Sequence, residues 1–353
     1  MSEHVNRKML TLARETRELT QTALAEAIGV AQATISKIEH GIAEAPDGFC
    51  ERLSKALAYP PEFFRQDGEI ISSGLVFHRK RYSLHMRTKA KVEADATLRL
   101  IELRHLLESV EIDGDVPDLD PGDYAHDPRK VARALRHYWR MPKGPIPNLT
   151  QLLEKKGILI LPCNFGTDLL DGFFMDQTPP AIALNMSFTW DRLRFTISHE
   201  LGHMILHDTV TEDAEREANE FASEFLMPEE DILPQLDVGG RIGLPLFADL
   251  KRIWRVSMAA LIRRAADVGA ISPHQKKRFI IQMGQLGYRK REPASLDVPP
   301  ETPCLVRKIV DAHLGELGYS EEELAGLLCL HVDEFRTLYL NRPRLLRKLK
   351  VQL

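Results

Sequence analysis

The chain has 353 residues, with 47 basic and 51 acidic side chains and a formal net charge of −4. Its hydrophobic content of 44% and charged content of 28% are typical of a globular protein and exclude a wholly disordered chain. At about 100–200 residues per domain, this length predicts two or three domains. The balanced charge excludes a protein that coats nucleic acid by bulk charge, but it permits a small local DNA-binding module.

Membrane insertion and secretion are not indicated by the sequence. The longest apolar stretches, such as Ile158–Leu161, are far shorter than the ~20 residues that span a bilayer. The first ten residues lack the apolar core of a signal peptide. The four cysteines are scattered without a C-x-x-C pair, which is typical of reduced thiols. We therefore expect a cytoplasmic protein.

Composition predicts a multidomain, mainly α protein with four regions. Residues 1–67 are a dense run of short helical patterns. Residues 68–117 are a connector with a strand-like piece, a basic stretch at 78–91 and a long helical pattern. Residues 118–235 mix helices and strands and predict a small α+β domain. Residues 236–353 are mostly helical and contain segments shaped like a helix-turn-helix.

Residues 19–41 have the pattern of a helix, a tight turn and a second helix. Thr20 can cap the first helix, and Gly29 permits the turn. The second helix would expose small and polar side chains early, as reading of the major groove requires. These candidate DNA contacts are Gln32, Ala33, Thr34 and Lys37. Gln21, at the start of the first helix, is positioned to bond a DNA phosphate.

Residues 5–58 resemble the Xre, or lambda-repressor-like, helix-turn-helix family. The resemblance implies a five-helix domain that binds a double-stranded DNA operator. Residues 1–65 hold 8 Lys or Arg and 9 Asp or Glu, so a monomer would bind DNA weakly. We therefore expect a homodimer on two half-sites. A helical module that binds protein instead of DNA is the alternative.

The α+β region has strand signals between helical patterns. A capped helix is predicted from Asp127 to Tyr138, a second helix over Leu149–Lys156 and a strand over Ile158–Pro162. The alternation in Ala181–Asn185 predicts another strand. At a sheet edge it could hold an extended peptide substrate by strand addition, and an ordinary internal strand is equally possible.

An H-E-x-x-H sequence runs from His199 to His203 within a helical pattern that Thr189 can cap. Residues four apart share one face of a helix, so both imidazoles can bind one metal ion. Glu200 lies between them in sequence and can act as the general base toward an attacking water.

A catalytic zinc needs a third protein ligand, and residues 215–222 offer one on a second helical pattern. Glu215 and Asn219 are four apart, so the carboxylate can bind the metal while the amide oxygen accepts a hydrogen bond from a ligand imidazole. Glu217 is the rival ligand. The metzincin extension of the motif is absent, so we expect His207 in a loop or behind the ligands.

The segments RFTISHELGH at 194–203, EREAN at 215–219 and LMP at 226–228 resemble the ImmA/IrrE family of zinc metallopeptidases. The resemblance covers most of residues 70–295. It implies a gluzincin-like domain in which His199, His203 and Glu215 hold zinc, or manganese in its place, and Glu200 is the catalytic base.

The same family is similar to proteases that cut helix-turn-helix repressors. The resemblance therefore implies an endopeptidase that cleaves a repressor-like protein, itself or a partner, to control stress or mobile-element genes. The alternative is a transcription factor whose metallopeptidase-like domain is a non-catalytic metal or ligand sensor. A substrate must be extended to enter such a cleft, so we expect a cut in a linker, such as Asp67–Ser73 or Asp113–Asp123.

The helix-turn-helix pattern returns near the C-terminus at an offset of 300 residues. Leu324 and Ala325 repeat Leu24 and Ala25, while Cys329 replaces the turn glycine. The first helix of the copy begins with three glutamates. We interpret this segment as a helix-turn-helix scaffold for protein contact.

Overall fold

The structure is a computed structural model that describes residues 2–66, 85–207, 209, 211–237, 239, 242–289 and 291–340. The strand-like piece predicted at 70–77 and the first half of the basic stretch at 78–91 lie outside the described residues. The described chain forms two compact units. The first contains residues up to 66 with 85–112 and 304–340, and the second contains residues 113–303.

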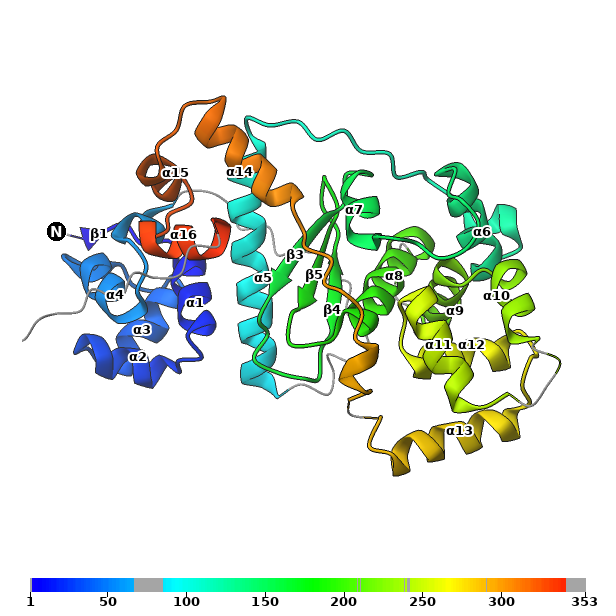
Figure 1. The fold of residues 1–353 in the computed structure, drawn as a ribbon. Coiled ribbons are helices and arrows are strands. Elements are labelled where there is room, and N and C mark those ends of the chain that lie inside the picture. The colour runs from blue at the N-terminus through cyan, green and yellow to red at the C-terminus, as the bar shows by residue number, and fades with distance from the viewer. Residues whose placement is uncertain are drawn as a thin grey trace, which may run out of the picture. The chain divides into compact units, whose positions relative to one another are not determined.

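The first unit begins with a small helical domain (Figure 1). Its elements are β1 (Ser2–Glu3), α1 (Arg7–Thr16), α2 (Gln21–Ile28), α3 (Gln32–Glu39), β2 (Ala45–Pro46), α4 (Phe49–Leu57) and the 3-10 helix η1 (Pro61–Arg65). β1 pairs antiparallel with β2. The fifth helix expected for this domain is thus a 3-10 helix, which begins directly after Pro60.

The turn between α2 and α3 has the predicted form. The Thr20 hydroxyl accepts a hydrogen bond from the Ala23 amide, which confirms it as the cap of α2. Gly29 has a φ of +70°, a left-handed conformation that glycine adopts without steric cost. Leu24 and Ile35 are fully buried between the two helices and hold them together.

Four further helices complete the first unit: α5 (Met86–Leu107), α14 (Leu305–Gly315), α15 (Glu321–Leu327) and α16 (Val332–Tyr339). α5 packs along α1, and its Leu98 joins the hydrophobic core of the N-terminal domain. The buried hydroxyl of Tyr339 bonds the carboxylate of Glu102 on α5. Arg17, after the end of α1, forms an ion pair with Glu334 of α16.

The C-terminal segment has the helix-turn-helix shape that its sequence predicts. α15, the turn and α16 repeat α2, the turn and α3 at the same offset of 300. Both turns contain the same backbone hydrogen bond. The Val30 amide donates to the Ala25 carbonyl, and the Leu330 amide donates to the Ala325 carbonyl, both at 2.9 Å. Cys329 adopts the left-handed conformation of the glycine it replaces, with a φ of +51°.

The second unit holds a mixed three-stranded sheet among helices (Figure 1). In chain order its elements are η3 (Pro121–Tyr124), α6 (Pro128–Tyr138), α7 (Leu149–Glu154), β3 (Leu159–Cys163), β4 (Gly172–Met175), β5 (Ala181–Asn185), α8 (Trp190–Leu206), α9 (Ala214–Leu226), α10 (Glu229–Leu236), α11 (Leu244–Trp254), α12 (Met258–Asp267), α13 (Pro273–Gln285) and η4 (Ala294–Leu296).

The strand order β3-β5-β4 puts β5 in the middle of the sheet. β3 runs parallel to β5, and β4 runs antiparallel to it. All five residues of β5 are buried, as expected for a central strand covered on both faces. Of the two possibilities for Ala181–Asn185, the internal strand is therefore correct, and β4 is an edge of the described sheet.

The helices after residue 236 belong to two different units. α11 to α13 extend the hydrophobic core of the second unit, to which Trp254, Leu261 and Phe279 contribute. α14 to α16 belong to the first unit. The predicted region 236–353 thus spans both units, because its two parts bury their apolar faces against different partners.

The Pro-rich segment between these two parts is held by buried charges. Lys251 lies between Asp191 and Glu292, 2.6 Å from each carboxylate. Glu301 pairs with Arg194 and accepts hydrogen bonds from the two backbone amides at the start of α7. Each linker glutamate therefore bonds a buried partner of the second unit. The described helices are all too short or too polar to span a lipid bilayer.

Candidate metal centre and DNA-reading helix

Helix α8 positions the H-E-x-x-H residues. Leu193, Ile197 and Leu201, spaced four apart, are fully buried and fix the face of α8 that packs on the core. Thr189 is the N-cap residue by its backbone, although its side chain makes no capping hydrogen bond. His199 and His203 follow on an adjoining face and are 7% and 2% exposed.

Three predicted ligands come together at this face. Nε2 of His199 and Nε2 of His203 are 3.0 Å apart. The carboxylate oxygens of Glu215, on α9, lie 3.7 Å from the first and 3.5 Å from the second. A tetrahedral zinc with bonds of about 2.0–2.1 Å spaces its ligand atoms about 3.3 Å apart. Two imidazoles and a carboxylate at these distances fit such an ion.

Two further residues of α9, Glu217 and Asn219, were predicted to lie near the metal. Glu217, the rival ligand, bonds Nε2 of His207 at 3.0 Å and is not in the group of three. The amide nitrogen of Asn219 donates to the backbone carbonyl of Glu215, 2.6 Å away. This bond engages the amide nitrogen of Asn219, whereas the bond predicted to a ligand imidazole concerns its amide oxygen and stays a prediction.

Glu200 points from α8 toward the edge strand of the sheet. Its carboxylate accepts a hydrogen bond of 2.9 Å from the Phe174 amide of β4, and its side chain is almost completely buried. Sequence reasoning missed β4, although Gly172-Phe-Phe-Met175 is an apolar run of strand length. The residue that bonds the candidate base was therefore missed as well.

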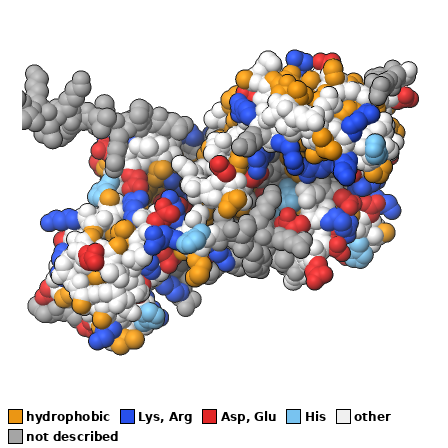
Figure 2. All heavy atoms as spheres, turned by 90° about the horizontal axis from the view of Figure 1, so that it is seen from below, with side chains coloured by type: hydrophobic (Ala, Val, Ile, Leu, Met, Phe, Trp, Pro, Cys, Tyr) orange, Lys and Arg blue, Asp and Glu red, His pale blue; other side chains and the backbone are white. Residues whose placement is uncertain are grey.

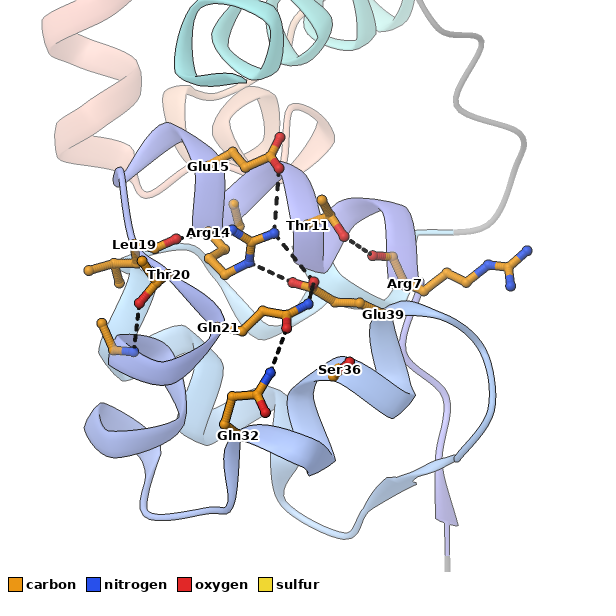
Figure 3. Close-up of polar contacts among 12 residues, drawn as sticks. Arg7, Thr11, Arg14, Glu15, Leu19, Thr20, Gln21, Gln32, Ser36 and Glu39 are labelled. Carbon is orange, nitrogen blue, oxygen red and sulfur yellow. Dashed lines mark hydrogen bonds and ion pairs between the residues drawn. The ribbon is translucent and has the colours of Figure 1, made fainter. Parts of the chain in front are cut away.

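Helix α3 presents the predicted DNA-reading side chains. Gln32, Ala33 and Lys37 are exposed and Thr34 is half-buried. Gln21 lies between two partners, since it donates to Glu39 at 2.7 Å and accepts from Gln32 at 2.8 Å (Figure 3). Its predicted position at the start of α2 is correct, and its bond to Gln32 is an additional finding.

An arginine anchors this polar network. Arg14 of α1 bonds Glu39 at 2.7 Å and also donates to the Leu19 carbonyl (Figure 3). The network thus runs from Arg14 through Glu39 and Gln21 to Gln32. Sequence patterns did not single out Arg14 or Glu39, because ion pairs between distant positions leave no periodic signal. On the face drawn in Figure 2, basic and acidic side chains occur on both units.

Family models match two parts of the chain. Residues 153–266 match the peptidase M78 model, described as an IrrE N-terminal-like domain, and contain the three candidate ligands. Residues 10–64 match a helix-turn-helix model and contain α2 and α3. No curated protein matches the chain. Both resemblances noted in the sequence are therefore confirmed.

Proposed function

The chain joins a helix-turn-helix domain to an IrrE N-terminal-like domain, and we propose that it is a DNA-binding transcriptional regulator with a zinc-dependent endopeptidase. The endopeptidase cleaves a repressor-like protein, itself or a partner, and so controls stress or mobile-element genes. The observation that carries this proposal is the approach of His199, His203 and Glu215 to one another, with Glu200 on the same helix.

The chemistry divides between the metal and the chain. Zinc, or manganese in its place, held by the three ligands would act as a Lewis acid toward a peptide carbonyl. The chain supplies Glu200 as the base that removes a proton from the attacking water. The Phe174 amide supports this role, because it holds the carboxylate at one place beside the sheet edge.

β4 is the strand that we assign to the substrate. It takes the role considered for Ala181–Asn185, which is central in the sheet. An edge strand can bind an extended peptide through main-chain hydrogen bonds. The hydrogen bond from the Phe174 amide to Glu200 supports this assignment by bringing the proposed base to this edge, and pairing with the peptide falls to the other backbone groups of β4.

In the DNA-binding part of the proposal, α3 supplies the contacts to the operator. Gln32, Ala33, Thr34 and Lys37 contact bases or nearby phosphates of an operator, while Gln21 contacts a phosphate and orients Gln32. We keep the homodimer on two half-sites in the proposal, because the N-terminal domain has no excess of basic residues. The proposal also keeps a cytoplasmic location, where the four cysteines, all thiols in the structure, stay reduced.

One of the two linkers considered for cleavage is tied to the second unit. Asp115 accepts bonds from Lys156 Nζ at 2.5 Å and from the Tyr138 hydroxyl at 2.9 Å. Its backbone amide and carbonyl are bonded as well, to Lys156 and to the Trp139 indole. These bonds disfavour entry of Asp113–Asp123 into a cleft in extended form. The other linker, Asp67–Ser73, lies outside the described residues.

The test compares wild type with Glu200→Gln, each loaded with zinc or manganese. Both are incubated alone and with candidate helix-turn-helix repressors, and fragments are mapped by mass. We expect fragments from wild type only. Identical fragments from both proteins would show that another activity cuts. Metal binding without fragments under any condition would favour the sensor function.

A further inference from the structure

A third imidazole lies behind the proposed metal ligands. His207 follows the last residue of α8, and its ring lies between His203 and Glu217. Its Nδ1 is 3.2 Å from Nδ1 of His203, and its Nε2 is 3.0 Å from the Glu217 carboxylate. The side chain of His207 is only 5% exposed. A continuous chain of polar contacts thus ends on the ring of a proposed ligand.

When the rings of His203 and His207 are both neutral, only one placement of their protons satisfies all the contacts from His203 to Glu217. His203 faces His199 and Glu215 with its Nε2, so metal binding requires a lone pair there and leaves the proton on Nδ1. That N–H donates to Nδ1 of His207, whose own proton must then lie on Nε2. The Nε2–H of His207 in turn donates to the carboxylate of Glu217.

Arg216 holds the far end of the chain of contacts. Its guanidinium lies 3.4 Å from Oε1 of Glu217, while Oε2 of the same carboxylate faces His207. The same arginine also bonds Glu220, one turn further along α9, at 2.9 Å. Glu217 and Glu220 therefore lie on the same helix and bond the same arginine, but of these two glutamates only Glu217 contacts His207.

We propose that His207 and Glu217 are positioning residues that hold His203 in the tautomer whose Nε2 binds the metal. The inference rests on the metal site of the proposed function. A hydrogen-bonded partner behind a ligating histidine orients its ring and makes its free nitrogen a better donor to the metal. Partners of this kind contribute about 10–100-fold to metal affinity. Glu217 thus helps to position the ligand His203 through His207, whereas Glu215 is itself a metal ligand.

The tautomer has an observable consequence in the metal-free protein. Nε2 of His203 is 3.0 Å from Nε2 of His199, so His203 can also carry its proton on Nε2 and donate it to His199. That alternative blocks the lone pair that a metal needs. His207 disfavours it, because its Nδ1 accepts a hydrogen bond from the Nδ1–H of His203. Removing His207 or Glu217 should therefore populate both tautomers of His203.

The first experiment measures zinc affinity by competition with a chromophoric chelator, using the full chain. Glu217→Ala should weaken zinc binding about 10–100-fold. Glu217→Gln should lose less, because its amide oxygen still accepts from His207. Glu220→Ala is the matched control and should bind zinc as wild type does. Glu215→Ala should lose far more than Glu217→Ala.

The outcomes separate the two proposals. If wild type binds no zinc, the proposed function fails. If wild type binds zinc and Glu217→Ala equals Glu220→Ala, the positioning role is wrong while the metal site stands. A loss in Glu217→Ala as complete as in Glu215→Ala would make Glu217 a ligand and also overturn the inference.

A second measurement detects the tautomer itself. Imidazole ¹⁵N NMR of the metal-free wild type should show His203 with its proton on Nδ1. Glu217→Ala and His207→Ala should show a mixture of tautomers, while Glu220→Ala should match wild type. A purely structural role would change stability without changing the tautomer, so the same His203 signals in all four proteins would overturn the inference.

Discussion

Gly202 of α8 lies so close to Ala218 of α9 that a Cβ on the glycine would be 3.2 Å from the Ala218 Cα. It would also be 3.0 Å from the ring of Phe221. The nearest atoms of Ala218 belong to its backbone, so they cannot rotate away from a side chain added at Gly202. This close approach of the two helices is what brings Glu215 of α9 within reach of the histidines on α8.

The first prediction follows from this contact. Gly202→Val should push α9 away from α8, cost about 1–3 kcal/mol of unfolding free energy by overpacking, and weaken zinc binding. Gly326→Ala is the control, since a Cβ at that helical position in α15 meets no atom within 4 Å. Zinc titration and thermal unfolding measure both effects. Unchanged zinc affinity in Gly202→Val would show that the approach of the helices does not position the ligands.

The second prediction concerns DNA. Gln32→Ala and Thr34→Ala should weaken binding to the cognate operator and spare much of the non-specific affinity, because base contacts carry the specificity. Gln21→Ala should weaken both. Ala27→Ser, an exposed change on α2 that leaves the charge unaltered, is the control. Titration of operator and random duplexes at fixed salt measures these affinities. If the full chain binds no duplex even at low salt, the module contacts protein instead.

The third prediction is a pH dependence of stability. Burial raises the pKa of Asp95 on α5 from 3.8 to about 6, against the opposing charges of Lys91 and Arg99. The folded state thus keeps a proton that the unfolded chain loses between about pH 4 and 6. The free energy of unfolding should therefore fall as pH rises through that window.

Asp95→Asn tests this sign. The variant should be more stable than wild type at pH 7.5, by up to about 3 kcal/mol, and should gain little at pH 4. Asp249→Asn removes a carboxylate on an exposed surface pair and should change little at either pH. Thermal unfolding of the full chain at the two pH values gives the comparison. A gain that is equal at both pH values would contradict the assignment.

Local patterns in the sequence predicted the elements that carry the candidate ligands. The H-E-x-x-H helix and the turn at Gly29 depend on short-range spacing and on capping chemistry, which a single sequence displays. The third ligand was less certain, because Glu215 and Glu217 lie on the same helical turns. The two side chains point to different sides of α9, and only the packing of α9 on α8 decides which carboxylate faces His199 and His203.

Long-range relationships were not visible in the sequence. The middle position of β5 depends on its pairing with both β3 and β4, and nothing in Ala181–Asn185 encodes which strands flank it. The same holds for α14 to α16, whose contacts with α5 join residues more than 200 positions apart. Such pairings arise from burial of complementary faces, which composition and periodicity do not specify.

The most direct measurement for the central claim is the metal content of purified protein. Wild type and Glu200→Gln should each hold one equivalent of zinc, because Glu200 is assigned as the base and not as a ligand. The double variant His199→Ala/His203→Ala should hold almost none, since two of three ligands are gone. Stoichiometric zinc in the double variant would contradict the assignment of the site.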